Sequence, residues 1–166
     1  VLVNAQQSTF SQTGASILIG DVTFVQPGRI ISADQATLNR DSSGQASTAD
    51  LQGQVVLREP GKLVIGQSGH IDFRTRLMSI YHAIYHYALS ETKPFQISAI
   101  SVSSSKGPIP TPQSTNSAQQ PPPNAWGIAD NVAEIQKGIV ELTGATYTTC
   151  APTENTWRVS AGKIIL

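Results

Sequence analysis

The sequence predicts an all-β protein of bent antiparallel strands, and three observations carry this prediction. Apolar and polar residues alternate with period two, one strand-turn-strand unit occurs twice, and several strands change their apolar face near the middle. The chain has 166 residues, of which 39% are hydrophobic and 13% charged. This is enough apolar material for the core of a single domain covering residues 1–166. We expect about nine strands and almost no helix.

The repeated unit is a pair of strands joined by a Pro-Gly turn. Residues 20–33 align with residues 53–66. In both copies a cation follows Pro-Gly, and the dipeptide suits a tight turn because Pro fixes φ and Gly accepts a positive φ. Alternate residues before each turn share one buried face: Leu18, Gly20, Val22 and Phe24 in the first copy, and Leu51, Gly53, Val55 and Leu57 in the second.

The strand after the first turn changes its apolar face. Ile31 and Ala33 occupy odd positions, whereas Ala36 and Leu38 occupy even ones. Strict alternation cannot bury all four, so we predict a β-bulge near Asp34-Gln35 that inserts one residue and bends the strand. Small residues at such a bend allow a sharp turn. The same spacing occurs in three further segments: Val64, Gly66, Gly69 and Ile71; Val3, Ala5, Ser8 and Phe10; and Val159, Ala161, Ile164 and Leu166.

Connections and one ambiguous segment follow these units. Residues 39–48 are typical of a polar loop, and residues 74–76 of a short one. Residues 77–89 fit both helical and strand spacing, and we favour a strand because Tyr and Ile are good strand formers and all the neighbours are strands. That strand would place four residues on one side: Tyr81, Ala83, Tyr85 and Tyr87.

A segment of different composition interrupts the strands at about residues 94–124. Seven of the ten prolines fall there, among Ser, Thr, Gln and Asn. We expect a flexible insertion without a core of its own. Strands resume at Trp126 and cover roughly residues 126–136, 139–149 and 157–166.

Both ends of the predicted sheet are open to partners. Natural sheets usually protect their edges with charged residues or proline. The first strand, Val1 to Phe10, and the last, Trp157 to Leu166, carry few charges and no proline. Either these termini are cut from a longer sheet or they dock partners by strand addition. The candidate docking residues are Val1, Leu2, Val3, Asn4 and Ala5.

The charges and reactive residues argue against nucleic-acid binding and catalysis. Eleven Lys plus Arg balance eleven Asp plus Glu and neither sign forms a block, which argues against a phosphate-backbone partner held by a basic face. His82 and His86 lack a third metal ligand, and Ser68, His70 and Asp72 lack a nucleophile elbow. We expect neither an enzyme nor a cofactor. An enzyme acting on envelope glycans or lipids through these histidines stays as an alternative.

The single cysteine, Cys150, cannot close an internal disulfide. It is a buried thiol, a reactive thiol or half of a bridge to something absent. The residues that follow it, Ala-Pro-Thr-Glu-Asn-Thr, are typical of an exposed loop, and exposure favours the bridging role.

Several of these motifs also occur together in a known family. They are Gly20-Asp21-Val22 through Ala33-Asp34-Gln35-Ala36, the repeat from Gly53 with Arg58-Glu59-Pro60-Gly61, and Ala145-Thr146-Tyr147-Thr148-Thr149-Cys150 followed by Trp157-Arg158. Together they resemble the periplasmic amino-terminal domain of the LptD family of lipopolysaccharide-assembly proteins. The ending is the specific part. The other motifs mark the wider OstA-like group, which includes the LptA and LptC bridge proteins.

This resemblance implies a fold and a role. The fold is an open V-shaped β-jellyroll with a hydrophobic groove for the acyl chains of lipopolysaccharide. The role is that of a periplasmic domain of an outer-membrane protein, which receives the lipid from LptA by edge-strand addition. The lipid would pass to a carboxy-terminal barrel plugged by LptE, which lies outside this sequence, and Cys150 would bond to that barrel. An LptA- or LptC-type bridge protein is the alternative.

The inward-facing residues are the candidates for the lipid groove. On pattern alone they would form the ordinary core of a β-sandwich, so a structural interaction module without a groove also stays open. The candidates are Val3, Phe10, Leu18, Val22, Phe24, Ile31, Leu38, Leu51, Val55, Leu57, Val64, Ile71, Ala83, Tyr85, Val159, Ile164 and Leu166.

Overall fold

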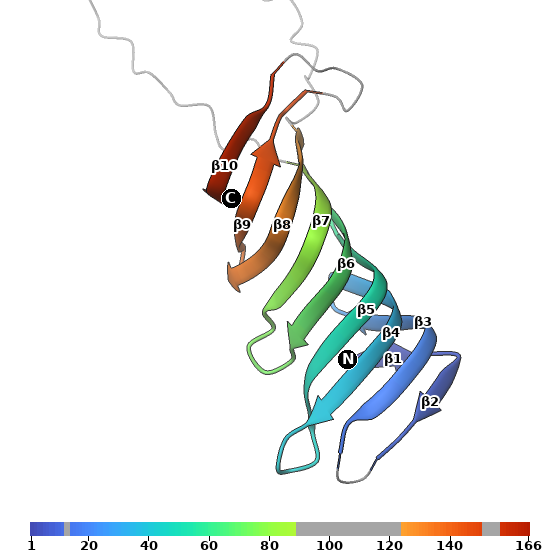
Figure 1. Cartoon of the computed structure of the whole chain (residues 1–166). Coiled ribbons are helices and arrows are strands. Elements are labelled where there is room, and N and C mark those ends of the chain that lie inside the picture. Colours follow the sequence, from blue (N-terminus) through green and yellow to red (C-terminus); the bar gives the residue numbers. More distant parts are fainter. Residues whose placement is uncertain (12–13, 89–123, 151–156) are drawn as a thin grey trace, which may run out of the picture.

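The computed structural model describes residues 1–11, 14–88, 124–150 and 157–166, which form one antiparallel sheet of ten strands (Figure 1). This confirms the all-β prediction. Within these ranges there is no helix, and so none that could cross a membrane. The strands are β1 Leu2–Asn4, β2 Gln7–Thr9, β3 Ser16–Gln26, β4 Arg29–Arg40, β5 Ala46–Glu59, β6 Lys62–Asp72, β7 Met78–Ala88, β8 Asn124–Gln136, β9 Ile139–Tyr147 and β10 Val159–Ile165.

Successive strands pair with each other, so the sheet grows hairpin by hairpin along the chain. The order is β1-β3-β4-β5-β6-β7-β8-β9-β10, and β2 also pairs with β3. The two Pro-Gly turns join β3 to β4 and β5 to β6, and Gly28 and Gly61 have the predicted positive φ of 76° and 73°. One edge of the sheet is therefore formed by β1 and β2, and the other by β10.

The predicted change of face is present in β4. Ile31 and Ala33 are buried before it, and Ala36 and Leu38 are buried after it. The sixth strand repeats the change, because its buried positions also shift by one residue in the middle. Each of these strands can therefore bury both of its halves.

The extra residue of the bulge lies on the neighbouring strands rather than on β4. Gly20 and Asp21 of β3 together face Asp34, and β5 has the same excess around Gly53. A Cβ atom on Gly53, which has a φ of +85°, would lie 2.2 Å from Asp34 Oδ2. This carboxylate accepts a hydrogen bond from the backbone N–H of Gln54 at 3.0 Å. The repeated Gly and the Asp of the sequence thus form the bend together.

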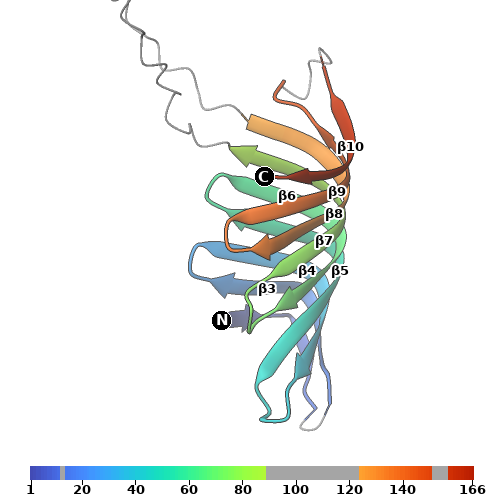
Figure 2. The same ribbon diagram turned by 90° about the vertical axis from the view of Figure 1, so that its left-hand side faces the viewer.

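The bends divide the sheet into two layers that face each other across the core (Figure 2). Phe24 of one layer and Phe73, next to the other, have ring centroids 5.8 Å apart. This open, bent sheet has the predicted jellyroll fold class. The first layer comprises residues 7–9, 16–19, 35–40, 46–52, 68–72, 78–81, 131–136, 139–143 and 163–165; the second comprises 2–4, 22–26, 29–33, 55–59, 62–66, 83–88, 124–129, 145–147 and 159–161.

Two strand boundaries differ from the prediction. The segment Val1 to Phe10 is not one strand, because Ala5 and Gln6 separate β1 from β2 and the Gln6 backbone N–H donates to the Gly20 carbonyl at 3.0 Å. Strands also extend into the predicted loop 39–48, since β4 and β5 stay paired as far as Arg40. Most of the predicted insertion lies outside the described residues.

The seventh strand, β7, confirms the strand predicted within residues 77–89, but one of its tyrosines lies on the other face from the one predicted. The chain changes face at His82, whose φ is +51°. Tyr81 is consequently 40% exposed, whereas Tyr85 and Tyr87 are buried. The prediction that Tyr81 shares their side was wrong, because it applied strict alternation across the bend.

Candidate functional site

The space between the two layers is lined by the inward-facing residues of the bent strands. Most predicted groove residues lie there: Leu18, Val22, Phe24, Ile31, Leu38, Leu51, Val55, Leu57, Val64, Ile71, Ala83 and Tyr85 are buried, and Val3, Ile164 and Leu166 pack partly against them. Two predicted groove residues are not part of the packed core, since Phe10 is 67% and Val159 50% exposed.

The interior opens at the end formed by β1, β2 and β3. A pocket of about 400 Å³ lies there between the layers. Phe10 lines this pocket, which explains its exposure, because its ring borders an open space instead of a packed core. The other lining residues are Val3, Asn4, Ala5, Ser8, Leu18 and Leu38.

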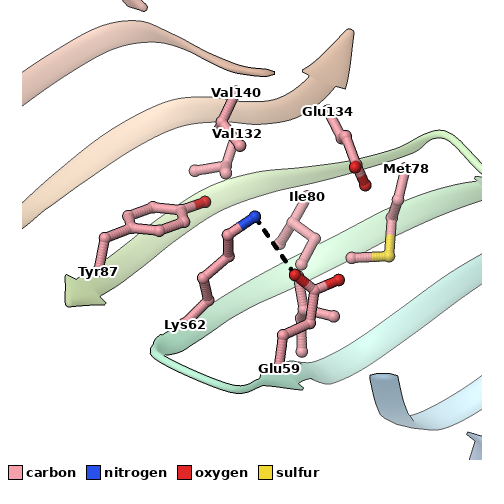
Figure 3. Close-up of a pocket in the computed structure, with 9 residues that line it drawn as sticks. Glu59, Lys62, Met78, Ile80, Tyr87, Val132, Glu134 and Val140 are labelled. Carbon is pink, nitrogen blue, oxygen red and sulfur yellow. Dashed lines mark ion pairs between the residues drawn. The ribbon is translucent and has the colours of Figure 1, made fainter. Parts of the chain in front are cut away.

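The middle of the interior is closed. A cavity between β5, β6, β7, β8 and β9 measures about 20 Å³, roughly the space of one water molecule (Figure 3). The side chains that fill this section come from both layers: Leu57 and Tyr87 from the second, and Met78, Ile80, Val132 and Val140 from the first. Burial raises the pKa of the Tyr87 hydroxyl well above its usual range.

A charged cluster fastens the two layers together over this section. Arg29, the first residue of β4, donates hydrogen bonds from Nε to Glu59 and from Nη2 to Glu134. Glu59 belongs to the second layer and Glu134 to the first, so Arg29 bridges them. All three side chains are at most 15% exposed. We call this cluster the clasp.

Two further contacts hold the clasp. Arg29 Nη1 donates to the Arg76 carbonyl at 3.1 Å, and Lys62 Nζ lies 3.3 Å from Glu59 Oε2 (Figure 3). Burial works against the charge on Arg29, but the hydrogen bonds that it donates to Glu134 and Glu59 outweigh this effect and raise the pKa of the guanidinium. Arg29 therefore remains charged at any physiological pH.

Sequence reasoning missed the clasp and part of the interior. The sequence shows Arg29 and Lys62 only as the cations that follow the two Pro-Gly turns. Lys62 has its partner Glu59 three residues away, but Glu59 and Glu134 lie 30 and 105 positions from Arg29, so no local pattern reveals the cluster. The sequence does contain a signal for the buried residues of β7, β8 and β9, because the change of face seen in β4 also occurs in these strands. The buried residues of these three strands that the predicted groove set lacks are Met78, Ile80, Tyr87, Ala125, Ala129, Val132, Val140, Leu142 and Ala145.

The residues considered for chemistry are dispersed. His86 lies 3.2 Å from Asn124 Oδ1 and stacks on Trp126, and His70 Nδ1 lies 2.7 Å from Asp50 Oδ1 on the exposed outer face. Across the described ranges, no three His, Cys, Asp or Glu side chains gather as metal ligands would. Cys150 is half-buried, and its backbone N–H donates to Thr148 Oγ1 at 3.1 Å.

The two sheet edges lie at opposite ends of the molecule (Figure 1). Leu2, Val3 and Asn4 form β1, with Val1 and Ala5 on either side. Among the described strands, β1 pairs with β3 alone and β10 with β9 alone. Each edge therefore presents backbone groups along one side.

No protein-family model matches the chain, but individual proteins do. The LPS-assembly protein LptD of Coxiella burnetii is 31% identical over 152 residues, which is 91% of this chain and 15% of that protein. The chain is a relative of LptD. LptD of Acinetobacter baumannii is 26% identical over 99% of this chain and 16% of its own length. The chain thus spans about a sixth of the length of these LptD relatives.

A solved structure shares the fold. It is LptH of Pseudomonas aeruginosa, described as the LptA-homologous periplasmic component of a lipopolysaccharide transport device, with a TM-score of 0.57 at 10% identity. The likeness covers 99% of this chain and 92% of that one. An LptD-like sequence on an LptA-like fold fits an amino-terminal LptD domain.

Proposed function

We propose that this chain is a lipopolysaccharide-carrying domain of an LptD-type assembly protein. The observation that carries the proposal is the apolar interior, which is shared by all long strands and opens at one sheet edge beside Phe10. Each methylene group removed from water contributes about 0.8 kcal/mol, so the burial of acyl chain there would be strongly favourable. The names and the fold of the relatives support lipopolysaccharide as the ligand.

The partners follow from the same proposal. The exposed edge at Val1 to Ala5 would receive an LptA-type bridge by strand addition. The domain would act in the periplasm, as part of an outer-membrane protein, and would deliver the lipid to a barrel that holds LptE. Cys150 would form its disulfide with that barrel, and no nucleic acid, cofactor or catalytic step is involved.

Photo-crosslinking in the full-length protein in cells tests the lipid groove. A photoreactive residue at Phe24 or Leu38 faces the interior, where the side chains are 0% and 8% exposed. We expect lipopolysaccharide adducts from both positions. Ile19 and Ile84 are matched controls, because they lie on the outer face and are 46% and 61% exposed. Equal adducts from the outer positions would contradict the proposal.

A second candidate is a structural interaction module with an ordinary packed core. The narrow cavity of about 20 Å³ in the middle of the interior favours it. Such a module would give protein crosslinks from the β1 edge and no lipid adduct from Phe24 or Leu38.

An LptA- or LptC-type bridge protein is the remaining alternative within lipid transport, and the LptH-like fold supports it. The gene downstream of Leu166 distinguishes the two. A continuous reading frame that encodes an outer-membrane barrel would establish the LptD type, and a stop codon would establish the bridge type.

A further inference from the structure

A second hollow lies outside the clasp, between the rims of the two layers. It has a volume of about 610 Å³, and its lining includes the apolar residues Pro27, Phe73 and Leu77. Its charged residues are four cations and two carboxylates: Arg29, Lys62, Arg76 and Lys137, with Glu59 and Glu134. We call this hollow the cationic mouth.

In the part of the chain that the structure describes, the carboxylates in the mouth are paired, whereas two of its cations are not. Glu59 and Glu134 are both engaged by Arg29, and Glu59 also by Lys62. Of the ion pairs within the described residues, none involves Arg76 or Lys137. The net charge of the mouth is therefore positive, although the whole chain has a formal net charge of zero.

The two spare cations line the same hollow and lie in turns that contact the clasp. The Arg76 carbonyl accepts a hydrogen bond from Arg29, and the backbone N–H of Gly138, next to Lys137, donates to Glu134 Oε1 at 3.3 Å. Arg76 thus belongs to the β6–β7 turn and Lys137 to the β8–β9 turn, and each turn donates or accepts one hydrogen bond at the clasp. Guanidinium and ammonium groups are the usual protein ligands of phosphate.

We propose that the cationic mouth binds the phosphate-bearing head group of an acylated lipid, with Arg76 and Lys137 supplying the charge. Apolar lining residues beside unpaired cations match an anionic amphiphile better than a free anion, because a free anion makes no use of the apolar side chains. This inference rests on the proposed function, since it assigns the polar end of the same ligand.

Binding by the purified chain tests this site with three probes: lipid A, the same lipid with its phosphates removed, and inorganic phosphate. The variant Arg76→Gln/Lys137→Gln removes both spare cations. We expect it to bind lipid A about tenfold more weakly at low salt, and to bind the dephosphorylated lipid as the unaltered chain does. Raising the ionic strength should reduce the difference.

Arg58→Gln/Arg158→Gln is the matched control. Both of these arginines are exposed and neither lines the mouth, so the same charge is removed elsewhere. An equal loss of affinity in the control would overturn the proposal, because it would show a general charge effect. Displacement of lipid A by inorganic phosphate at equal affinity would also overturn it, by assigning the cations to a free anion.

The outcomes separate this inference from the proposed function. If the unaltered chain binds both lipids equally well, the lipid groove stands and the head-group site is wrong. If it binds neither lipid, the proposed function fails and the head-group site fails with it.

Discussion

The open end beside β1 and β2 and the closed middle under the clasp are built from the same bent strands, yet only one leaves space between the layers. At the open end the lining includes the small residues Ala5 and Ser8, and the pocket measures about 400 Å³. In the middle, Ile80, Met78 and Tyr87 reduce the cavity to about 20 Å³. The bend creates two layers, and side-chain size decides whether they enclose a groove or a core.

The charged groups reinforce this difference. The clasp ties the layers together in the middle, whereas no ion pair of the described residues joins side chains that line the open pocket. A ligand that travelled along the interior from the open end would therefore have to separate the layers at the clasp. The following predictions measure how far the two regions differ.

The largest effect is expected in the closed middle, from Ile80→Ala. The Ile80 side chain is 0% exposed, so its truncation leaves a cavity between the layers. We expect the free energy of unfolding to fall by about 2–5 kcal/mol, measured by urea denaturation. A loss below about 1 kcal/mol would show that the middle is loosely packed and already resembles the open end.

Removal of the clasp is expected to have the next largest effect. Arg29→Met leaves Glu59 and Glu134 as two largely buried carboxylates without their shared cation. We expect a loss of about 2 kcal/mol in the free energy of unfolding. Adding Glu134→Gln to that variant should recover part of the loss, because it removes one uncompensated charge. No recovery would mean that Arg29 acts through packing and not through charge.

A smaller, pH-dependent effect is expected from Tyr85. Its hydroxyl donates to the Thr146 carbonyl at 2.6 Å, and Tyr85→Phe should cost about 1 kcal/mol in unfolding free energy at neutral pH. Burial raises the pKa of Tyr85 to about 12 from 10.0. The protonated form therefore contributes stability that is complete below pH 10 and is lost as the pH rises toward 12.

Urea denaturation at pH 8 and pH 11 tests this dependence. The unaltered chain should lose stability between the two values, and Tyr85→Phe should lose less. Equal losses would assign the alkaline transition to other groups, with Tyr87 as the next candidate, since its pKa is also raised by burial.

The smallest effect is expected at the open end, from Phe10→Ala. Phe10 is 67% exposed and borders the pocket, so its removal creates no new cavity. We expect a change of less than about 0.5 kcal/mol in the free energy of unfolding. A loss comparable to that of Ile80→Ala would show that the open end closes around Phe10 in solution.

The sequence by itself determined the strands, the turns and the bend. Pro27-Gly28 and the alternation around Phe24 are local patterns. The spacing from Ala33 to Ala36 predicts a change of face from neighbouring residues alone, without information on the strands that pair with this one. These features depend on backbone geometry and on burial of one face, which neighbouring residues encode. The same patterns placed most of the predicted groove residues in the interior.

The tertiary structure alone decided where the interior is open and where it is closed. The clasp joins Arg29 to Glu134, which is 105 positions away, and the closed section depends on side chains from opposite layers. The alternation of apolar and polar residues predicts which face of the sheet a side chain lies on, but it does not predict which side chains of the other layer it contacts. The distance between the layers depends on the sizes and charges of the side chains that face each other across the interior. Only the folded sheet brings these side chains together.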